Sequence, residues 1–365
     1  MDNKIIEIPL YLQNNKSLFF TLKNETLNRL NSLEYLYGQV PNYNNQKLYR
    51  NNIIKTSISD IDIESKEETS YIESLAAICC KKIKNKNQKT AYNLLNLLEN
   101  GILEEQTTLS VEYIKRIWLL LTKDNRNIEA FYPDFRRSSV RVIKKGKNPF
   151  KNDVIYVAPK YKEVIPMLEK LVNFINRYTI SDKPLINAVL KASIFMAYFV
   201  YIHPFLDGNG RTGRLLMNKI LIDNGFDKFR YVSINSEIVK HKSEYSNELQ
   251  KIEVKNDGDI TSYIAYMVNV FYSLLDRMSN PNRRQLDYAS LSNREIIMLS
   301  CIQGSSHGIY VKQYKSTWNS IAKEHGYPLI KVKDAEKDLM HLFFLDFIVY
   351  DERYTLYPGF KYYNK

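Results

Sequence analysis

The sequence predicts a mainly α-helical protein of two or three domains. Its 365 residues exceed one ordinary domain. Hydrophobic residues make up 44% and charged residues 25%, values typical of globular chains, which excludes a mainly disordered or fibrous protein. Apolar residues recur at helical spacing over most of the chain. The helices expected from this spacing are 90–100, 110–122, 161–178, 184–202, 212–224, 233–255 and 259–279.

Composition excludes several other classes. Three cysteines cannot build a disulfide scaffold, and the five histidines are scattered without zinc-site spacing. The N-terminus lacks a secretory signal, and the longest uncharged apolar stretch, 192–202, is shorter than the about 20 residues of a membrane span. We therefore expect a soluble, cytoplasmic protein with no membrane contact. The net charge of +12 suits an anionic partner, but lysine runs usually mark a solvated face.

The N-terminal third begins with short apolar pieces among many asparagines, so residues 1–55 read as extended or irregular. From Ser57 the spacing is helical, including the stretch from Tyr71 to Cys79, and Gly101 is suited to end the helix at 90–100. We place a first region at 1–110 and a helical core at 111–280.

The segment 139–158 differs from its surroundings. Two β-branched runs flank a turn rich in Lys, Gly, Asn and Pro, which predicts a β-hairpin with a long loop.

The last segment follows a linker around Pro281. A helix at 292–302, a helix–turn–helix ending in 331–343 and two β-rich pieces are typical of a winged-helix module, which we place at 285–365. Such modules often bind DNA, but residues 281–365 carry 12 Lys and Arg against 9 Asp and Glu, and the second helix has a mixed face. Nucleic acid is therefore an open but not favoured partner, behind protein contact or packing on the core.

Residues 203–214 read HPFLDGNGRTGR and concentrate the chemistry. An apolar helix delivers His203 to its end, where Pro204 stops it. Gly208 and Gly210 allow a tight turn, and the N-terminus of the next helix points its N–H groups into the same loop. This arrangement predicts an anion site.

The charged side chains of this loop extend the site. Arg211 and Arg214, three residues apart, suit phosphate oxygens, while Asp207 suits Mg²⁺ held beside a phosphate. Asn209 can orient either a phosphate or the loop backbone. His203 is suited to take a proton from a hydroxyl near neutral pH. The implied reaction is transfer from a nucleoside triphosphate to an alcohol.

The segment HPFLDGNGRTGR resembles the Fic (filamentation induced by cAMP) motif, and every fixed position is present. The resemblance implies the Fic fold over roughly 40–280 and AMP transfer from ATP, with Mg²⁺, to a protein hydroxyl. It makes His203 the general base and Asp207 the magnesium ligand. It assigns nucleotide and phosphate contacts to Asp207, Gly208, Asn209, Gly210, Arg211, Thr212, Gly213 and Arg214. Gly210 together with Arg214 favours AMP transfer over kinase-like chemistry.

The same resemblance assigns roles outside the motif. The hairpin at 139–158 is similar to the Fic flap, which pairs with an extended target segment, and Val154, Tyr156 and Val157 would line it. Residues 241–259 resemble a segment bordering the nucleotide, which implicates Tyr245, Ser246 and Asn256. Tyr245 and Leu249 match that pattern, whereas Ser246 replaces a tyrosine.

An inhibitory helix, Ser/Thr-x-x-x-Glu-Gly/Asn, occurs in many Fic proteins. Residues 60–65, within a helix expected at about 57–66, resemble it. Glu64 matches, whereas Asp60 and Ser65 depart from the pattern. The resemblance implies that Glu64 pairs with Arg214 and displaces the γ-phosphate.

The leading interpretation is a protein adenylyltransferase restrained by Glu64. One alternative is removal of AMP from a modified protein at the same site, with Glu64 orienting a water. Another is a DNA-binding regulator whose core senses ATP. Self-modification and a homodimer remain open, and the sequence names neither the target protein nor its acceptor residue.

Overall fold

The computed structural model describes residues 5–42, 46–64, 83–124, 134–145, 152–255, 257–279, 290–303, 308–345, 347–350 and 361–364. The chain divides into two compact units. The first comprises Met1–Asn44 and Asn96–Ser279, and the second comprises Asn45–Leu95 and Asn280–Lys365. The boundaries expected from the sequence, 1–110, 111–280 and 285–365, stay predictions.

The first unit begins with an antiparallel hairpin of β1 (Ile5–Tyr11) and β2 (Ser17–Thr21), followed by α1 (Asn24–Gln39). The expectation of extended or irregular structure over 1–55 fits the hairpin but is wrong for α1 and for residues 46–55, which are also helical. Leu30 and Leu33 lie three residues apart and are fully buried. Burying this face outweighs the weak helix propensity of the asparagines around it.

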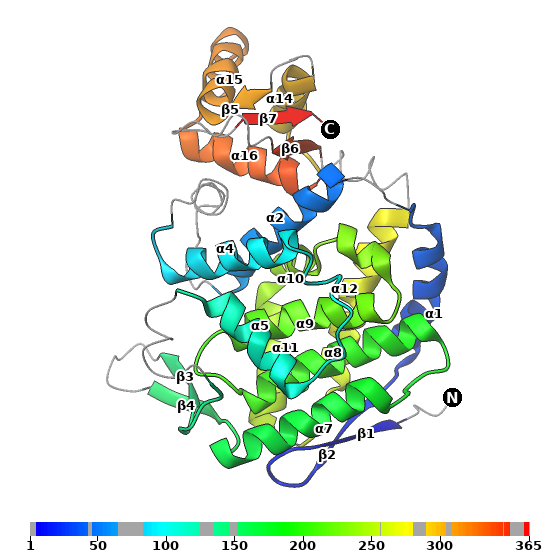
Figure 1. Ribbon diagram of the computed structural model, residues 1–365. Helices are drawn as coiled ribbons and strands as arrows, with labels where there is room; N and C mark the ends of the chain where they lie inside the picture. The colour runs from blue at the N-terminus through cyan, green and yellow to red at the C-terminus, as the bar shows by residue number, and fades with distance from the viewer. Residues whose placement is uncertain are drawn as a thin grey trace. The chain divides into compact units, whose positions relative to one another are not determined.

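The core of this unit is α8 (Pro184–Ile202), whose residues are buried along almost its whole length. It contacts α7 (Val164–Arg177), α9 (Asn209–Asp223), α11 (Lys242–Lys255) and α12 (Thr261–Ser279), as Figure 1 shows. Among the described residues, α8 is the one helix long and apolar enough to cross a membrane, yet 89% of that window is buried inside the protein. The buried core helix expected at this position is confirmed.

Several helix boundaries differ from those expected. The helix expected from residue 212 begins at Asn209, and the one expected at 233–255 is divided into α10 (Ile234–Lys240) and α11 at His241. Helices α4 (Lys86–Glu99) and α5 (Val111–Thr122) lie where the periodicity placed them. Ser110 caps α5 by accepting a hydrogen bond from the Tyr113 N–H.

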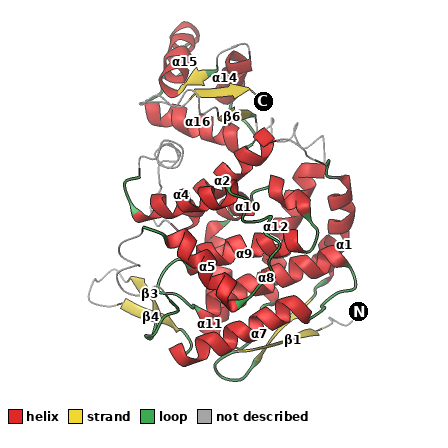
Figure 2. Cartoon of the chain, in the orientation of Figure 1, coloured by secondary structure: helices red, strands yellow, loops and turns green. Residues whose placement is uncertain are grey.

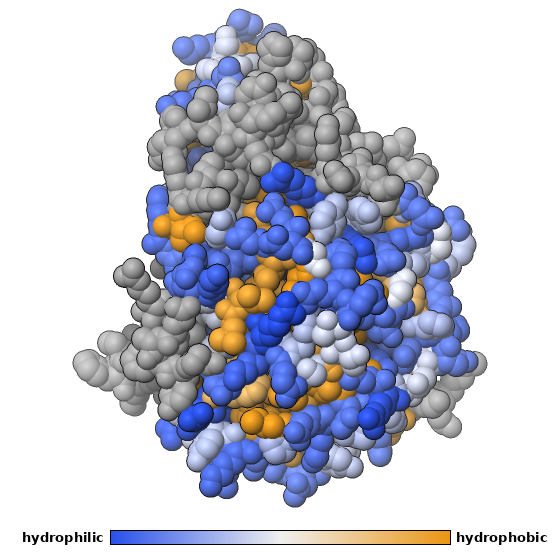
Figure 3. Space-filling model, in the orientation of Figure 1, coloured by the Kyte–Doolittle hydropathy of each residue, from blue (hydrophilic) through white to orange (hydrophobic). Residues whose placement is uncertain are grey.

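The hairpin expected at 139–158 is present as β3 (Arg141–Lys145) and β4 (Asn152–Val157), which stand out as strands among the helices of this unit in Figure 2. The strands are antiparallel, Arg141 lies opposite Val157, and the register shifts between Val142 and Ile143. Figure 3 shows a largely hydrophilic surface with scattered apolar patches, as expected for a helical protein whose apolar faces pack inward.

The second unit contains α2 (Gln46–Glu64), α14 (Asn293–Gln303), α15 (Val311–His325) and α16 (Val332–Phe344). Its strands β5 (Ile309–Tyr310), β6 (Ile348–Tyr350) and β7 (Lys361–Asn364) form an antiparallel sheet in the order β5-β7-β6. The expected helices at 292–302 and 331–343 are therefore present, and β6 lies within the first expected β-rich piece. The second piece, 354–360, lies outside the described residues, and the assignment as a winged helix stays a prediction. The stretch from Tyr71 to Cys79 lies outside the described residues.

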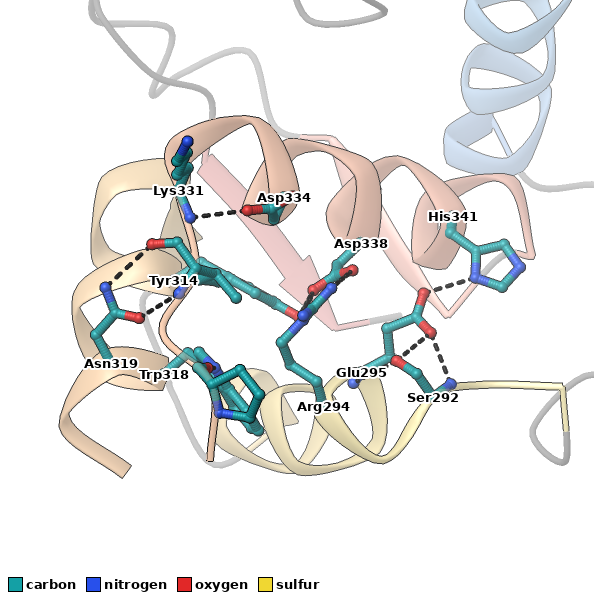
Figure 4. A network of polar contacts seen from close by, with 12 residues as sticks. Ser292, Arg294, Glu295, Tyr314, Trp318, Asn319, Lys331, Asp334, Asp338 and His341 are labelled. Carbon is teal, nitrogen blue, oxygen red and sulfur yellow. Dashed lines mark hydrogen bonds and ion pairs between the residues drawn. The ribbon is translucent and has the colours of Figure 1, made fainter. Parts of the chain in front are cut away.

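A polar network joins α14, α15 and α16 (Figure 4). The buried Asp338 carboxylate accepts from Arg294 Nε and Nη2 at 2.6 and 2.8 Å and from the Tyr314 hydroxyl at 2.8 Å. Asp334 accepts from the Lys331 N–H at the start of α16. One of the acidic side chains of α16, Asp338, therefore faces the interior of this unit, where it links the three helices.

Candidate functional site

His203 lies directly after the last turn of α8, in the left-handed region with φ 50° and ψ 60°. Its N–H donates to the Phe199 carbonyl at 3.1 Å. This conformation is uncommon for a residue with a side chain. Pro204 contributes to it, since a residue before proline is disfavoured in the right-handed helical region. The chain therefore leaves the helix axis at the candidate base.

Aromatic rings hold the loop that follows. Phe205 is fully buried and stacks on Trp118 of α5, with ring centroids 4.3 Å apart and planes within 1°. Phe135 stacks near Phe205 at 5.2 Å. The Trp118 indole also donates to the Asp207 carbonyl at 2.8 Å. The loop is thus fixed from α5 as well as from its own two helices.

Asn209, the first residue of α9, closes the loop on itself. Its side-chain oxygen accepts from the Phe205 N–H at 2.9 Å, and its amide nitrogen donates to the Phe205 carbonyl at 2.8 Å. Gly208 precedes it with φ 81°, a conformation that glycine adopts without strain. Of the two uses that the sequence allowed for Asn209, the structure shows the backbone one.

The N-terminal turn of α9 carries the phosphate-binding candidates. Gly210 and Arg211 lie in its first turn, where helical N–H groups have no partner within the helix. Arg211 and Arg214 are only 4% and 3% exposed, and Thr212 is buried. Gly213 contacts α8 so closely that a Cβ atom there would lie 2.6 Å from Met196 Sδ. Two buried guanidinium groups beside a helix N-terminus suit a multiply charged anion.

A magnesium ion on a bound triphosphate would fit this loop. Asp207 is half-buried, and its Oδ1 accepts from the Gly208 N–H at 2.7 Å. Mg²⁺ commonly takes one or two carboxylates together with phosphate oxygens and water. Within the described ranges, no group of three or more His, Cys, Asp or Glu side chains could hold a metal by itself.

The hairpin is tied to the end of α8. The Tyr156 hydroxyl donates to the Tyr201 carbonyl at 2.8 Å, and the Gln13 side chain donates to the Val157 carbonyl at 2.9 Å. Tyr156 is buried and thus anchors the hairpin, whereas Val157 is 48% exposed. The side chain of Val154 lies outside the described residues. Nearby, Glu253 of α11 is buried, which raises its carboxyl pKa to about 7.

The remaining candidates are dispersed. Tyr245 is buried on α11 with its ring 6.1 Å from that of Tyr266, so it belongs to the core, while Ser246 is exposed. Asn256 lies outside the described residues. Glu64 is the exposed last residue of α2, in the second unit.

Sequence reasoning missed Trp118, Phe205 as a stacking partner, and Arg136. Arg136 is buried and donates to the carbonyl of His203 at 2.7 Å. Nothing in the local pattern distinguishes it from the other Lys and Arg residues of this basic chain. A cavity of about 610 Å³ lies elsewhere, beside the C-terminal end of α9, and does not belong to the motif at its N-terminal end.

Known proteins are similar to this chain over the region that contains the motif. Residues 108–221 match the family model described as Fic/DOC family. A protein adenylyltransferase Fic of Nematostella vectensis is 32% identical over 128 residues, which are 35% of this chain and 28% of the relative. A probable protein adenylyltransferase of Aquifex aeolicus is 31% identical over 134 residues, 34% of this chain and 42% of the relative. The chain thus matches less than half of the length of these relatives.

Solved structures agree on the fold. A Fic family protein from Desulfovibrio desulfuricans superposes with a TM-score of 0.57 at 17% identity, covering 95% of this chain and 97% of that one. Fic-1 of C. elegans superposes with a TM-score of 0.54 at 19% identity, covering 73% and 74%. With the motif at 203–214 complete, the chain carries a Fic/DOC family domain at residues 108–221.

Proposed function

We propose that the protein is an adenylyltransferase that moves AMP from ATP to a Ser, Thr or Tyr hydroxyl of a target protein and releases pyrophosphate. The observation that carries this proposal is the loop between α8 and α9, which begins with His203 and leads into the N-terminal turn of α9 with the buried Arg211 and Arg214. The names of the related adenylyltransferases support it.

The reaction follows from these groups. The target hydroxyl oxygen forms a bond to the α-phosphorus as the bond from that phosphorus to the bridging oxygen breaks, and pyrophosphate leaves. His203 takes the hydroxyl proton. Arg211 and Arg214 hold the β- and γ-phosphates, and the first N–H groups of α9 bind phosphate oxygens. A magnesium ion held by Asp207 would neutralise charge on the phosphates.

The target segment docks on the hairpin. In the part of the chain that the structure describes, β3 and β4 pair only with each other, which leaves each strand an outer edge. An extended peptide can add to such an edge by main-chain hydrogen bonds. The exposed Val157 offers a side-chain contact, while Tyr156 keeps β4 in place.

Restraint by Glu64 is the second part of the proposal. Glu64 is exposed at the C-terminal end of α2, and the resemblance makes it the inhibitory carboxylate. A carboxylate that binds Arg214 bidentately competes with the γ-phosphate for the same donors. Removing the Glu64 carboxylate therefore raises the rate of AMP transfer.

The test uses ATP labelled at the α-phosphate, with Mg²⁺, alone and with cell lysate. The variants are wild type, Glu64→Gly, Glu64→Gly with His203→Ala, and Asp62→Gly as a matched change near the same helix end. Label on protein in Glu64→Gly, absent without His203 and not raised by Asp62→Gly, supports transfer and restraint together. Equal labelling by wild type and Glu64→Gly contradicts the restraint. Absence of label in every variant contradicts the transferase, and release of AMP from a labelled protein by wild type alone would instead support AMP removal.

A further inference from the structure

Arg136 is a buried arginine with no acidic partner among the described residues. It lies between α5 and β3 and is 1% exposed. Among the described residues, its guanidinium group donates only to main-chain carbonyl oxygens. Burying a charged group without a counter-ion is costly unless hydrogen bonds compensate it, so this position has a specific requirement for the arginine.

The acceptors belong to two separate parts of the candidate site. Nε donates to the His203 carbonyl at 2.7 Å and Nη2 to the Ile202 carbonyl at 3.3 Å, where α8 ends. Nη1 donates to the Ser138 carbonyl at 2.9 Å, just before β3, and Nη2 donates to the Pro159 carbonyl, just after β4. One planar side chain therefore contacts both ends of the hairpin and the backbone of the candidate base.

The main chain of Arg136 strengthens this link. Its N–H donates to the Pro204 carbonyl at 2.9 Å, so backbone and side chain hold the residues on both sides of the bend after α8. The rigid fork of a guanidinium fixes the relative positions of its acceptors, which the single ammonium of a lysine does not. The last carbonyls of α8 also lack helical partners and favour a cation.

We propose that Arg136 is a positioning residue that fixes the hairpin relative to His203, so that a hydroxyl presented on the hairpin meets the imidazole. This inference rests on the proposed AMP transfer. A displacement of about 1 Å between reacting groups can lower a rate by about 100-fold. In the described structure the hydrogen bonds of Arg136 go to carbonyls of the α8 end, the bend after it and the hairpin ends, and not to the phosphate candidates of α9, so nucleotide binding is separable from its effect.

The experiment compares Arg136→Lys and Arg136→Gln with the parent that transfers AMP, wild type or Glu64→Gly. We expect kcat for transfer to fall about 10- to 100-fold, while the Kd of a non-hydrolysable ATP analogue changes less than about 3-fold. Lys191→Met is the matched control. Lys191 is 6% exposed in the same unit and donates to the Ile175 carbonyl near the end of α7 at 2.7 Å. It should lose thermal stability and retain transfer.

Hydrogen exchange separates failure of this inference from failure of the proposed function. In Arg136→Lys, exchange should accelerate together in peptides spanning the hairpin ends and in the peptide containing His203, with or without catalysis. Acceleration on one side alone overturns the coupling. Equal losses of kcat in Arg136→Lys and Lys191→Met, or a parallel loss of nucleotide binding, would reduce Arg136 to a general stabilising residue and overturn the positioning role.

Discussion

Replacement of Asn209 by alanine tests how the motif loop is held. The change removes two hydrogen bonds between this side chain and the backbone of Phe205, at 2.9 and 2.8 Å. Each buried hydrogen bond contributes about 0.5–1.5 kcal/mol net, so we expect the loop to lose about 1–3 kcal/mol of local stability. That loss corresponds to about a 5- to 150-fold increase in the open population.

Hydrogen exchange of peptides covering residues 203–214 measures this directly, because the Phe205 N–H loses its acceptor. Asn218→Ala is the control on the same helix, since Asn218 Oδ1 is buried without a hydrogen-bond partner. Asn209→Asp, which keeps the acceptor and loses the donor, should give an intermediate acceleration. Exchange in Asn209→Ala within 2-fold of wild type would refute the loop-closing role and return Asn209 to direct phosphate contact.

Three further predictions concern stability. Gly208→Ala places a side chain at φ 81° with its Cβ 3.3 Å from Trp118 Nε1, so urea denaturation should show a loss of about 1–2 kcal/mol, and none would contradict the strain. Burial raises the Glu253 pKa to about 7 from 4.5, so the folded state loses stability as pH rises between these values, by up to about 3 kcal/mol. Glu253→Gln should therefore stabilise more at pH 8 than at pH 5 in thermal melts, and a gain equal at both pH values would be inconsistent with that shift. Asp338→Ala leaves Arg294 without its carboxylate partner, which costs about 3–5 kcal/mol and should lower the melting temperature of the second unit.

Periodic and local signals predicted much of the fold. The uninterrupted apolar run placed α8 at 184–202, and alternation around a Lys-, Gly- and Asn-rich turn placed the hairpin β3–β4. The same reasoning failed for α1, where asparagines obscured the Leu30–Leu33 face, because propensity is a weak guide when tertiary burial decides. Tyr245, which the resemblance assigns to the nucleotide, is buried on α11 with its ring beside that of Tyr266, and its contact with the nucleotide stays a prediction.

The sequence alone predicted the chemistry proposed for the loop from His203 to Arg214, because its histidine, glycines and arginines lie next to one another in one turn between two helices. Only the tertiary structure decided which distant residues contact that loop and the ends of the hairpin. Arg136 lies 67 residues before the His203 carbonyl that it binds, and Trp118 lies 89 residues from Asp207. Contacts across such separations leave no periodic trace in the chain, since they arise only when packing brings the segments together.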